Sequence, residues 1–173
     1  MQKGILIIDY GSQYTQLIAR RIREFNVYCE IHPFNKISIL LLNKLNPKGI
    51  ILSGGPNSVL EKNSPQMKNY LLELNIPILG ICYGLQLLTN KLGGLIKKSS
   101  IREYGFAKLK IISKSKIIPK EWLKKEITVW MSHGDHVSKK PKDFQIIAKS
   151  NNQNISIISN ENKNIYGLQF HPE

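Results

Sequence analysis

A cysteine bracketed by glycines is the first candidate for chemistry in this sequence. Cys82 lies in IPILGICYGLQLLT (residues 76–89), between an apolar run and a run of helix formers. The pattern G-I-C-Y-G at 80–84 is that of a nucleophile elbow with cysteine in place of serine. The glycines remove Cβ clashes at a sharp turn, and the following helix N-terminus favours a thiolate. We predict that Cys82 is a nucleophile, whereas Cys29, within the expected strand 27–32, is interpreted as a core residue.

A histidine and a glutamate stand two residues apart in the segment GLQFHPE (167–173). In an extended segment, residues i and i+2 point the same way, so His171 and Glu173 can both face the elbow. Glu173 would then bind one imidazole nitrogen while the other nitrogen faces Cys82. This arrangement predicts a triad of nucleophile, base and orienting carboxylate. A surface His–Glu pair is the alternative if the segment is considered alone.

A glycine-rich loop, Ser53-Gly-Gly-Pro56, follows the apolar stretch 48–53. Its backbone N–H groups can converge on a developing oxyanion, and the N–H of Tyr83, next to the nucleophile, is a natural second donor. A simple Gly-Pro turn is the alternative. The loop also resembles the phosphate-gripping SGGxDS loop of ATP pyrophosphatases. However, Pro56 lacks an N–H and Asn57 replaces the aspartate, so we reject a nucleotide site here.

The segment MSHGDH (131–136) contains two of the four histidines. His133, His136 and Asp135 could suggest a metal site. Their spacing, with no cysteine ligand nearby, does not fit the usual zinc ligand sets. We therefore predict no metal, and interpret the segment as a loop that lines a polar substrate pocket.

The first half of the chain alternates between apolar strands and amphipathic helices. The apolar runs predict strands at 4–9, 27–32, 48–53 and 76–81. Helices are expected at 13–25 with Ser12 as the N-cap, at 36–45, at 66–74 after Pro65, and at 83–92. Such alternation predicts an α/β fold with a mostly parallel central sheet and helices on both faces.

The second half is rich in short β-type segments, separated by loops of Gly, Asn and Lys. These segments are 103–112, 127–131, 144–150, 155–160 and 164–170. We expect them to add antiparallel strands to the same sheet and to a small flanking one. Without repeats or a linker, residues 1–173 are predicted to form a single domain.

Composition narrows the classes of function. The 173 residues are 42% hydrophobic and 21% charged, which is typical of a globular domain. The net charge of +13 invites a nucleic-acid role, but the lysines are dispersed rather than gathered in a stripe with aromatics, so we expect no nucleic-acid partner. No apolar run could span a bilayer and no secretion signal is present, so we expect a cytoplasmic protein without a membrane partner. Two cysteines alone make no disulfide framework.

The motifs together resemble those of the triad-type, class I glutamine amidotransferases, and the match extends over essentially the whole chain. DYGSQYTQLIARRIRE, LSGGPNSV, GICYGLQLL, MSHGD and GLQFHPE resemble the amidotransferase domains of GMP synthetases in particular. The resemblance implies that Cys82 attacks the glutamine amide, that His171 moves the proton and that Glu173 orients His171. Gly55 and Tyr83 would supply the oxyanion hole. The residues implied to hold glutamine are Gln86, Asn57, Ser132, Gly134 and Asp135.

The same resemblance implies a partner. Ammonia would pass to an ATP-pyrophosphatase (synthetase) domain or subunit that binds XMP and ATP, with Mg²⁺, in a homodimeric parent enzyme. The glutaminase step itself would need no cofactor. The sequence contains neither that domain nor a dimerisation domain, so we expect an amidotransferase domain truncated at its C-terminus. The alternatives are an amidotransferase that serves anthranilate, aminodeoxychorismate or carbamoyl phosphate synthesis, a non-catalytic regulatory domain of this fold, or a cysteine hydrolase acting on peptides.

Overall fold

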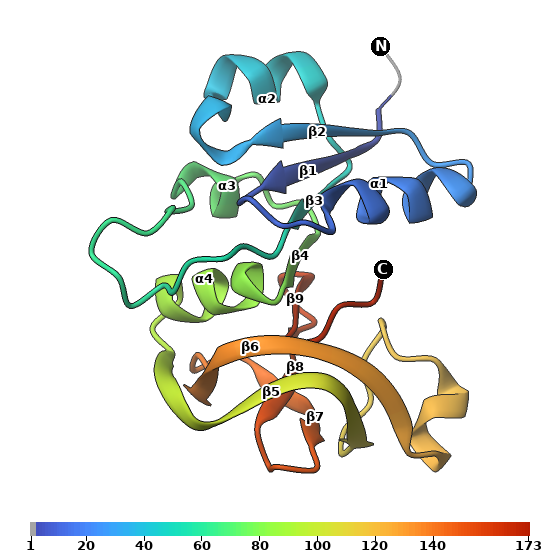
Figure 1. Cartoon of the computed structure of the whole chain (residues 1–173). Helices are drawn as coiled ribbons and strands as arrows, with labels where there is room; N and C mark the ends of the chain where they lie inside the picture. Colours follow the sequence, from blue (N-terminus) through green and yellow to red (C-terminus); the bar gives the residue numbers. More distant parts are fainter. Residues whose placement is uncertain (1–2) are drawn as a thin grey trace.

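Helices and strands alternate through the first half, as predicted. The computed structural model describes residues 3–173, apart from the side chains of residues 100, 101 and 124. The elements are β1 (Ile5–Asp9), α1 (Thr15–Glu24), β2 (Cys29–Pro33), the 3₁₀ turn η1 (Phe34–Lys36), α2 (Ile39–Leu45), β3 (Gly49–Leu52), α3 (Tyr70–Glu73), β4 (Ile78–Ile81) and α4 (Tyr83–Lys91). Figure 1 shows their arrangement around the parallel strands.

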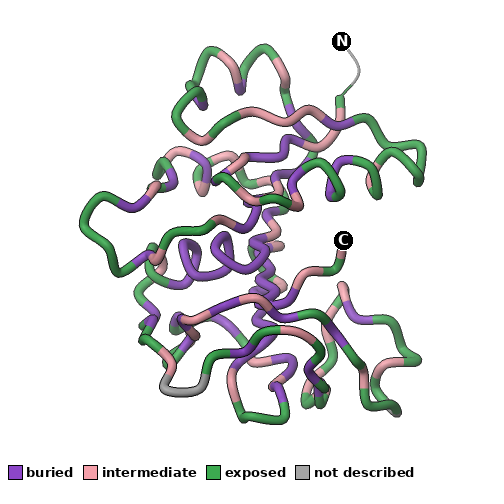
Figure 2. Tube along the Cα trace, viewed as in Figure 1, coloured by how far each residue is buried: buried purple, intermediate pink, exposed green. Residues whose placement is uncertain are grey.

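Helices cover both faces of the parallel strands, because the strands are apolar on both sides. In β1, Leu6 and Ile8 pack with residues of α2, α3 and α4, whereas Ile7 packs with Ile18 and Ala19 of α1. Helix α4 lies in the interior, with seven consecutive buried residues from Tyr83 to Thr89. Figure 2 shows this concentration of buried residues along α4 and the strands beside it. The predicted α/β class is confirmed.

The second half consists of strands. They are β5 (Leu95–Ile111), β6 (Ile127–Lys139), β7 (Gln145–Ser150), β8 (Ile155–Asn160) and β9 (Ile165–Leu168), with the 3₁₀ turn η2 (Lys120–Lys124) before β6. The sheet order is β2-β1-β3-β4-β9-β8-β6-β5-β7, and β7 also pairs with β8. Strands β8, β6, β5 and β7 are therefore joined in a closed ring of antiparallel pairings. The expectation of added antiparallel strands is confirmed for these four.

Strand β9 differs from that expectation, because it returns to the parallel part of the sheet. It pairs in parallel with β4, with Ile81 opposite Leu168, and antiparallel with β8. The Cys82 N–H donates to the Leu168 carbonyl at 2.7 Å. The carboxyl end of β9 is thereby brought beside that of β4, the edge where α/β sheets usually form their sites.

Two local expectations were wrong. Ser12 does not cap α1: its Oγ accepts from the Tyr14 N–H, and Asp9 Oδ1 accepts from the Gly11 N–H and the Thr15 hydroxyl, so the helix begins only at Thr15. The helix expected at 66–74 is reduced to α3, because residues 65–69 run irregularly and bring Met67 into the core. Within the described residues, no helix is long and apolar enough to cross a membrane.

Candidate active site

Cys82 occupies a sharp turn between β4 and α4, as predicted. Its backbone has φ 51°, a conformation that costs free energy in a residue with a Cβ atom. The flanking glycines are required by close packing: a Cβ on Gly80 would lie 2.5 Å from the Gly84 carbonyl, and one on Gly84 would lie 2.3 Å from the Leu52 oxygen. The side chain is nearly buried, and its Sγ lies 3.7 Å from the Ser132 oxygen. The structure therefore presents one thiol at the edge of the sheet.

His171 and Glu173 follow β9 and come to the same place. The His171 N–H donates to the Trp130 carbonyl of β6 at 2.9 Å, which fixes the backbone of this segment. Imidazole Nδ1 lies 2.9 Å from Glu173 Oε1, and the ring also hydrogen-bonds with Cys82. Both side chains are nearly buried. The structure therefore brings the thiol, the imidazole and the carboxylate together.

The environment of His171 favours its charged form. Burial alone lowers the pKa of His171, but the hydrogen bonds and negative charges of Cys82 and Glu173 outweigh burial and raise the pKa to about 9. At neutral pH the imidazole is therefore a cation beside the sulfur. Such a pair stabilises a thiolate and holds a proton ready for a leaving group.

The Ser53–Pro56 loop lies against the elbow. A Cβ built on Gly54 would lie 3.2 Å from His171 Cε1 and 3.7 Å from Cys82 Cβ. Gly55 must be glycine, since a Cβ there would lie 2.7 Å from the Tyr10 carbonyl. The Gly84 N–H donates to the Ser53 carbonyl, which joins the loop to α4.

The two predicted oxyanion donors are the N–H groups of Gly55 and Tyr83. Both residues line the cavity that contains Cys82. Tyr83 is the first residue of α4, where a backbone N–H has no partner within the helix. Both residues therefore line the same cavity as the Cys82 sulfur, and their role as oxyanion donors stays a prediction.

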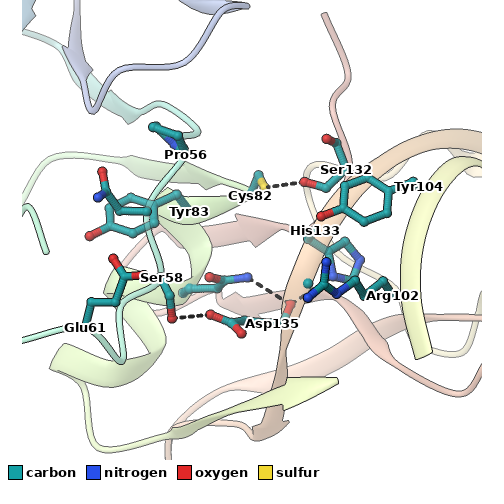
Figure 3. Close-up of a pocket in the computed structure, with 14 residues that line it drawn as sticks. Pro56, Ser58, Glu61, Cys82, Tyr83, Arg102, Tyr104, Ser132, His133 and Asp135 are labelled. Atoms are coloured by element: carbon teal, nitrogen blue, oxygen red, sulfur yellow. Dashed lines mark hydrogen bonds between the residues drawn. The ribbon is translucent and has the colours of Figure 1, made fainter. Parts of the chain in front are cut away.

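A cavity of about 340 Å³ extends from Cys82 and contains every residue implied to hold glutamine. Figure 3 shows Cys82 and Ser132 at one end and Ser58, Glu61 and Asp135 at the other. The predicted residues that line it are Asn57, Gln86, Ser132, Gly134 and Asp135. The lining residues that the sequence did not indicate are Ser58, Glu61, Arg102 and Tyr104.

The segment MSHGDH is not the expected loop. It lies within β6, where it pairs with β5: Glu103 stands opposite His133, and Tyr104 opposite Ser132. Serine, glycine and aspartate suggested a turn, but the long partner strand keeps the segment extended. The Ser58 hydroxyl hydrogen-bonds to Asp135, so the loop after β3 and strand β6 meet across the cavity.

His133 has no free ring nitrogen. Nδ1 lies 2.8 Å from the Asp135 carbonyl, and Nε2 lies 2.9 Å from Glu103 Oε2. Burial raises the pKa of Glu103, but hydrogen bonds from His133, Ser150 and Asn152 outweigh it and lower the pKa to about 2. Both ring nitrogens of His133 therefore lie close to an oxygen atom, the Asp135 carbonyl on one side and the Glu103 carboxylate on the other. His133 thus joins β6 to Glu103 of β5, at the cavity wall.

Two buried amides connect this pair to the nucleophile. Gln86 Nε2 donates to the Asp135 carbonyl at 3.0 Å and to Gln169 Oε1 at 3.3 Å, and Gln169 Nε2 donates to the Cys82 sulfur at 3.7 Å. Because a carbonyl only accepts, the Asp135 oxygen fixes the orientation of Gln86, which in turn fixes that of Gln169. Gln169 was not predicted from the sequence, although it has the same i, i+2 relation to His171 that identified Glu173.

Known proteins resemble this chain along its length. The family model described as glutamine amidotransferase class-I matches residues 6–173. The GMP synthase (glutamine-hydrolyzing) of Brachyspira hyodysenteriae is 51% identical over 169 residues, which cover 98% of this chain and 32% of that protein. The protein of the same name from Caldanaerobacter subterraneus is 50% identical over 172 residues, covering 99% and 33%. The chain spans about a third of the length of the curated relatives it matches.

A solved structure agrees with this similarity. One Thermoplasma acidophilum protein, described as part of a GMP synthase, has a TM-score of 0.80 and 31% identity, covering 99% of this chain and 85% of that one. Both the fold and the sequence pattern are therefore found in these relatives.

Proposed function

Because the chain belongs to the class-I glutamine amidotransferase family, we propose that it hydrolyses L-glutamine to L-glutamate and ammonia at Cys82. The observation that carries the proposal is the contact of a strained elbow cysteine with a buried His171–Glu173 pair at the end of a polar cavity. The resemblance recognised in the sequence is confirmed at the level of the family. The roles of the individual residues are the content of the proposal.

The first half-reaction forms a thioester. The Cys82 thiolate adds to the side-chain amide carbon of glutamine, and the oxyanion accepts hydrogen bonds from the N–H groups of Gly55 and Tyr83. His171, cationic at neutral pH, gives its Nε2 proton to the amide nitrogen. The C–N bond then breaks, ammonia leaves, and a γ-glutamyl thioester and a neutral His171 remain.

The second half-reaction restores the enzyme. Neutral His171 accepts a proton from water as the water oxygen adds to the thioester carbon. The C–S bond breaks, glutamate leaves, and the thiolate and the imidazolium are both regenerated. Glu173 holds the imidazole in place and stabilises its charge through both half-reactions.

The charges around the cavity suit a zwitterionic amino acid. Asp135 and Glu61 lie at the end away from Cys82, where they can bind the α-ammonium group. Arg102 lies over Gly134, with its Nε 3.8 Å from the position of an added Cβ, and can bind the α-carboxylate. The side chains and backbone groups of Gln86, Asn57, Ser132 and Gly134 complete the contacts. No metal or organic cofactor enters this proposed step.

The acceptor of the ammonia is inferred from the relatives. Those of about 50% identity are GMP synthases, and this chain covers only a third of their length. We propose that the ammonia aminates XMP to GMP on a synthetase domain or subunit that uses ATP and Mg²⁺. The parent enzyme is proposed to be a cytoplasmic homodimer, on the basis of the family resemblance alone.

Loss of the thiol tests the glutaminase proposal. Cys82→Ala is expected to lower glutamate formation by more than about a thousandfold, since the covalent route is removed. Cys29→Ala is the matched control, because Cys29 is also buried but faces the Ala19 carbonyl in the core. A glutamine-analogue electrophile should label Cys82 alone in mass spectra, whereas a peptide electrophile should not. Unchanged turnover in Cys82→Ala would remove the mechanism.

A further inference from the structure

A second cavity meets the first at Cys82. It has a volume of about 200 Å³ and is lined by the loop after β1, including Ser12, Gln13 and Tyr14. Both cavities share Gly55, Pro56, Cys82 and Ser132. Among the described residues, His171 lines the second cavity and not the first, whereas Gln86 and Asp135 line the first and not the second. The sulfur thus lies between a charged cavity and a cavity that contains the proton donor.

We propose that this second cavity is the site through which the leaving ammonia departs and the attacking nucleophile arrives. The inference rests on the proposed function. The amino-acid part of glutamine needs the charged groups of the first cavity. The amide nitrogen must face His171 to receive its proton, so the nitrogen points into the second cavity. Water then attacks from the same side, because the same imidazole must accept its proton.

Hydrogen bonds within the loop after β1 and a ring contact hold one wall of the second cavity in place. Gly11 has φ 94°, and its N–H donates to Asp9 Oδ1 at 2.9 Å. Ser12 Oγ accepts from the Tyr14 N–H at 3.0 Å, and the Tyr14 ring packs edge-on against His171 with 4.9 Å between ring centres. The loop therefore holds Tyr14 against the proton donor. This preformed shape is expected to select nucleophiles by size.

The chemical class of ligand follows from the reaction and the volume. One water molecule occupies about 30 Å³, so the cavity is larger than ammonia or water requires. Small neutral nucleophiles such as hydroxylamine and N-methylhydroxylamine fit this space. Hydroxylamine would add to the thioester carbon, lose a proton to His171 and expel the Cys82 thiolate, giving γ-glutamyl hydroxamate. Atoms and charges balance as they do with water.

The experiment is a partition measurement in the full chain. Glutamine is supplied with hydroxylamine or N-methylhydroxylamine, and the hydroxamate and glutamate formed from the same thioester are both quantified. Gln13→Trp narrows the cavity and should lower the share of the N-methyl product by about tenfold. Tyr14→Ala widens the cavity and should raise that share. Because the ratio is measured per thioester formed, a slower variant still gives a valid result.

Asn57→Ala, in the first cavity only, is the matched control. It should raise KM for glutamine and leave the partition ratio unchanged. Equal ratios in wild type, Gln13→Trp and Tyr14→Ala would overturn the inference while the glutaminase proposal stands. Failure of the wild-type chain to form glutamate or hydroxamate from glutamine would contradict the proposed function itself.

Discussion

The pairs His171–Glu173 and His133–Glu103 are alike in burial and in the distance between imidazole and carboxylate, but differ in the group on the other side of the ring. In both, an imidazole nitrogen lies 2.9 Å from a carboxylate oxygen, and all four side chains are nearly buried. The other nitrogen of His171 meets the Cys82 sulfur, whereas that of His133 meets the Asp135 carbonyl. A buried His–Glu pair is therefore not a sign of catalysis by itself. The group on the far side of the imidazole decides its role.

Exchange of each histidine for asparagine gives the largest contrast. His171→Asn should lower glutamate formation by about 10² to 10⁴-fold, because the proton donor and the partner of the thiolate are lost. His133→Asn should leave kcat within about tenfold but cost about 3 kcal/mol of unfolding free energy, because the buried Glu103 carboxylate loses its imidazole neighbour. Enzyme assays and urea unfolding measure both effects. If His133→Asn instead abolished activity and His171→Asn mainly lowered stability, the roles assigned to the two pairs would be wrong.

The two pairs predict opposite pH dependences. The pKa of His171 is raised from 6.5 to about 9, so its stabilising pair is complete below pH 6.5 and is lost as the pH rises through 9. The rate of glutamate formation should decline over the same pH range, which gives the pH–rate profile an alkaline limb. Glu173→Gln removes one of the groups that raise the pKa of His171, so the limb should move to lower pH. A limb that stays near pH 9 in this variant would mean that Glu173 does not act on His171.

Glu103 is expected to make the stability of the protein depend on pH in the acidic range. Its pKa is lowered from 4.5 to about 2, so its contribution to stability is present above pH 4.5 and is lost as the pH falls through 2. Glu103→Gln should therefore be less stable than wild type at pH 7, and the difference should shrink as the pH falls below 4.5. Urea unfolding at pH 7 and pH 4 measures this change. The alkaline limb of the activity should not move in this variant.

The two pairs were not equally predictable from the sequence. The role of Cys82 follows from glycine spacing, and the contact between His171 and Glu173 follows from i, i+2 geometry, both of which are local rules. Glu103 could not be paired with His133 by such rules. Their contact depends on the register between β5 and β6, which shifts between Lys98 and Glu103. Arg102, which lines the cavity, lies within this shifted stretch.

The fold shows the same division. Apolar runs predicted β1 to β4, and helical spacing predicted α1, α2 and α4, because each pattern is a property of nearby residues. The parallel pairing of β9 with β4 joins residues more than 80 positions apart. The composition of residues 164–170 does not indicate this partner or the direction of the pairing. The turn-forming residues at 132–135 likewise suggested a loop, since the partner strand that keeps them extended lies about 30 residues earlier. In both cases, pairing between strands far apart in the sequence determined the conformation, which the local sequence pattern could not predict.

Substitution of Gln169 is expected to have the smallest effect. Because Gln169 lies between the two His–Glu pairs, it can show whether they are connected. His133 and Gln86 both donate to the Asp135 carbonyl, Gln86 donates to Gln169, and Gln169 donates to the sulfur that faces His171. One buried chain of contacts therefore runs from Glu103 to Glu173. Gln169→Leu removes a long hydrogen bond to the Cys82 sulfur, and should slow alkylation of Cys82 by a glutamine-analogue electrophile by about fivefold at neutral pH.

The double variant of His133→Asn and Gln169→Leu tests whether this series of contacts couples the His133–Glu103 pair to the reactivity of Cys82. If the His133 pair positions the thiolate through the amides, the effects of the two changes on the alkylation rate will not add, because Gln169→Leu already breaks the route. If the pair only stabilises β6, the effects will add within experimental error. Gln169→Glu is the matched control, since it keeps the shape but points an acceptor or a hydroxyl at the sulfur. The rate should then fall most at high pH, where the new carboxylate is ionised and repels the thiolate.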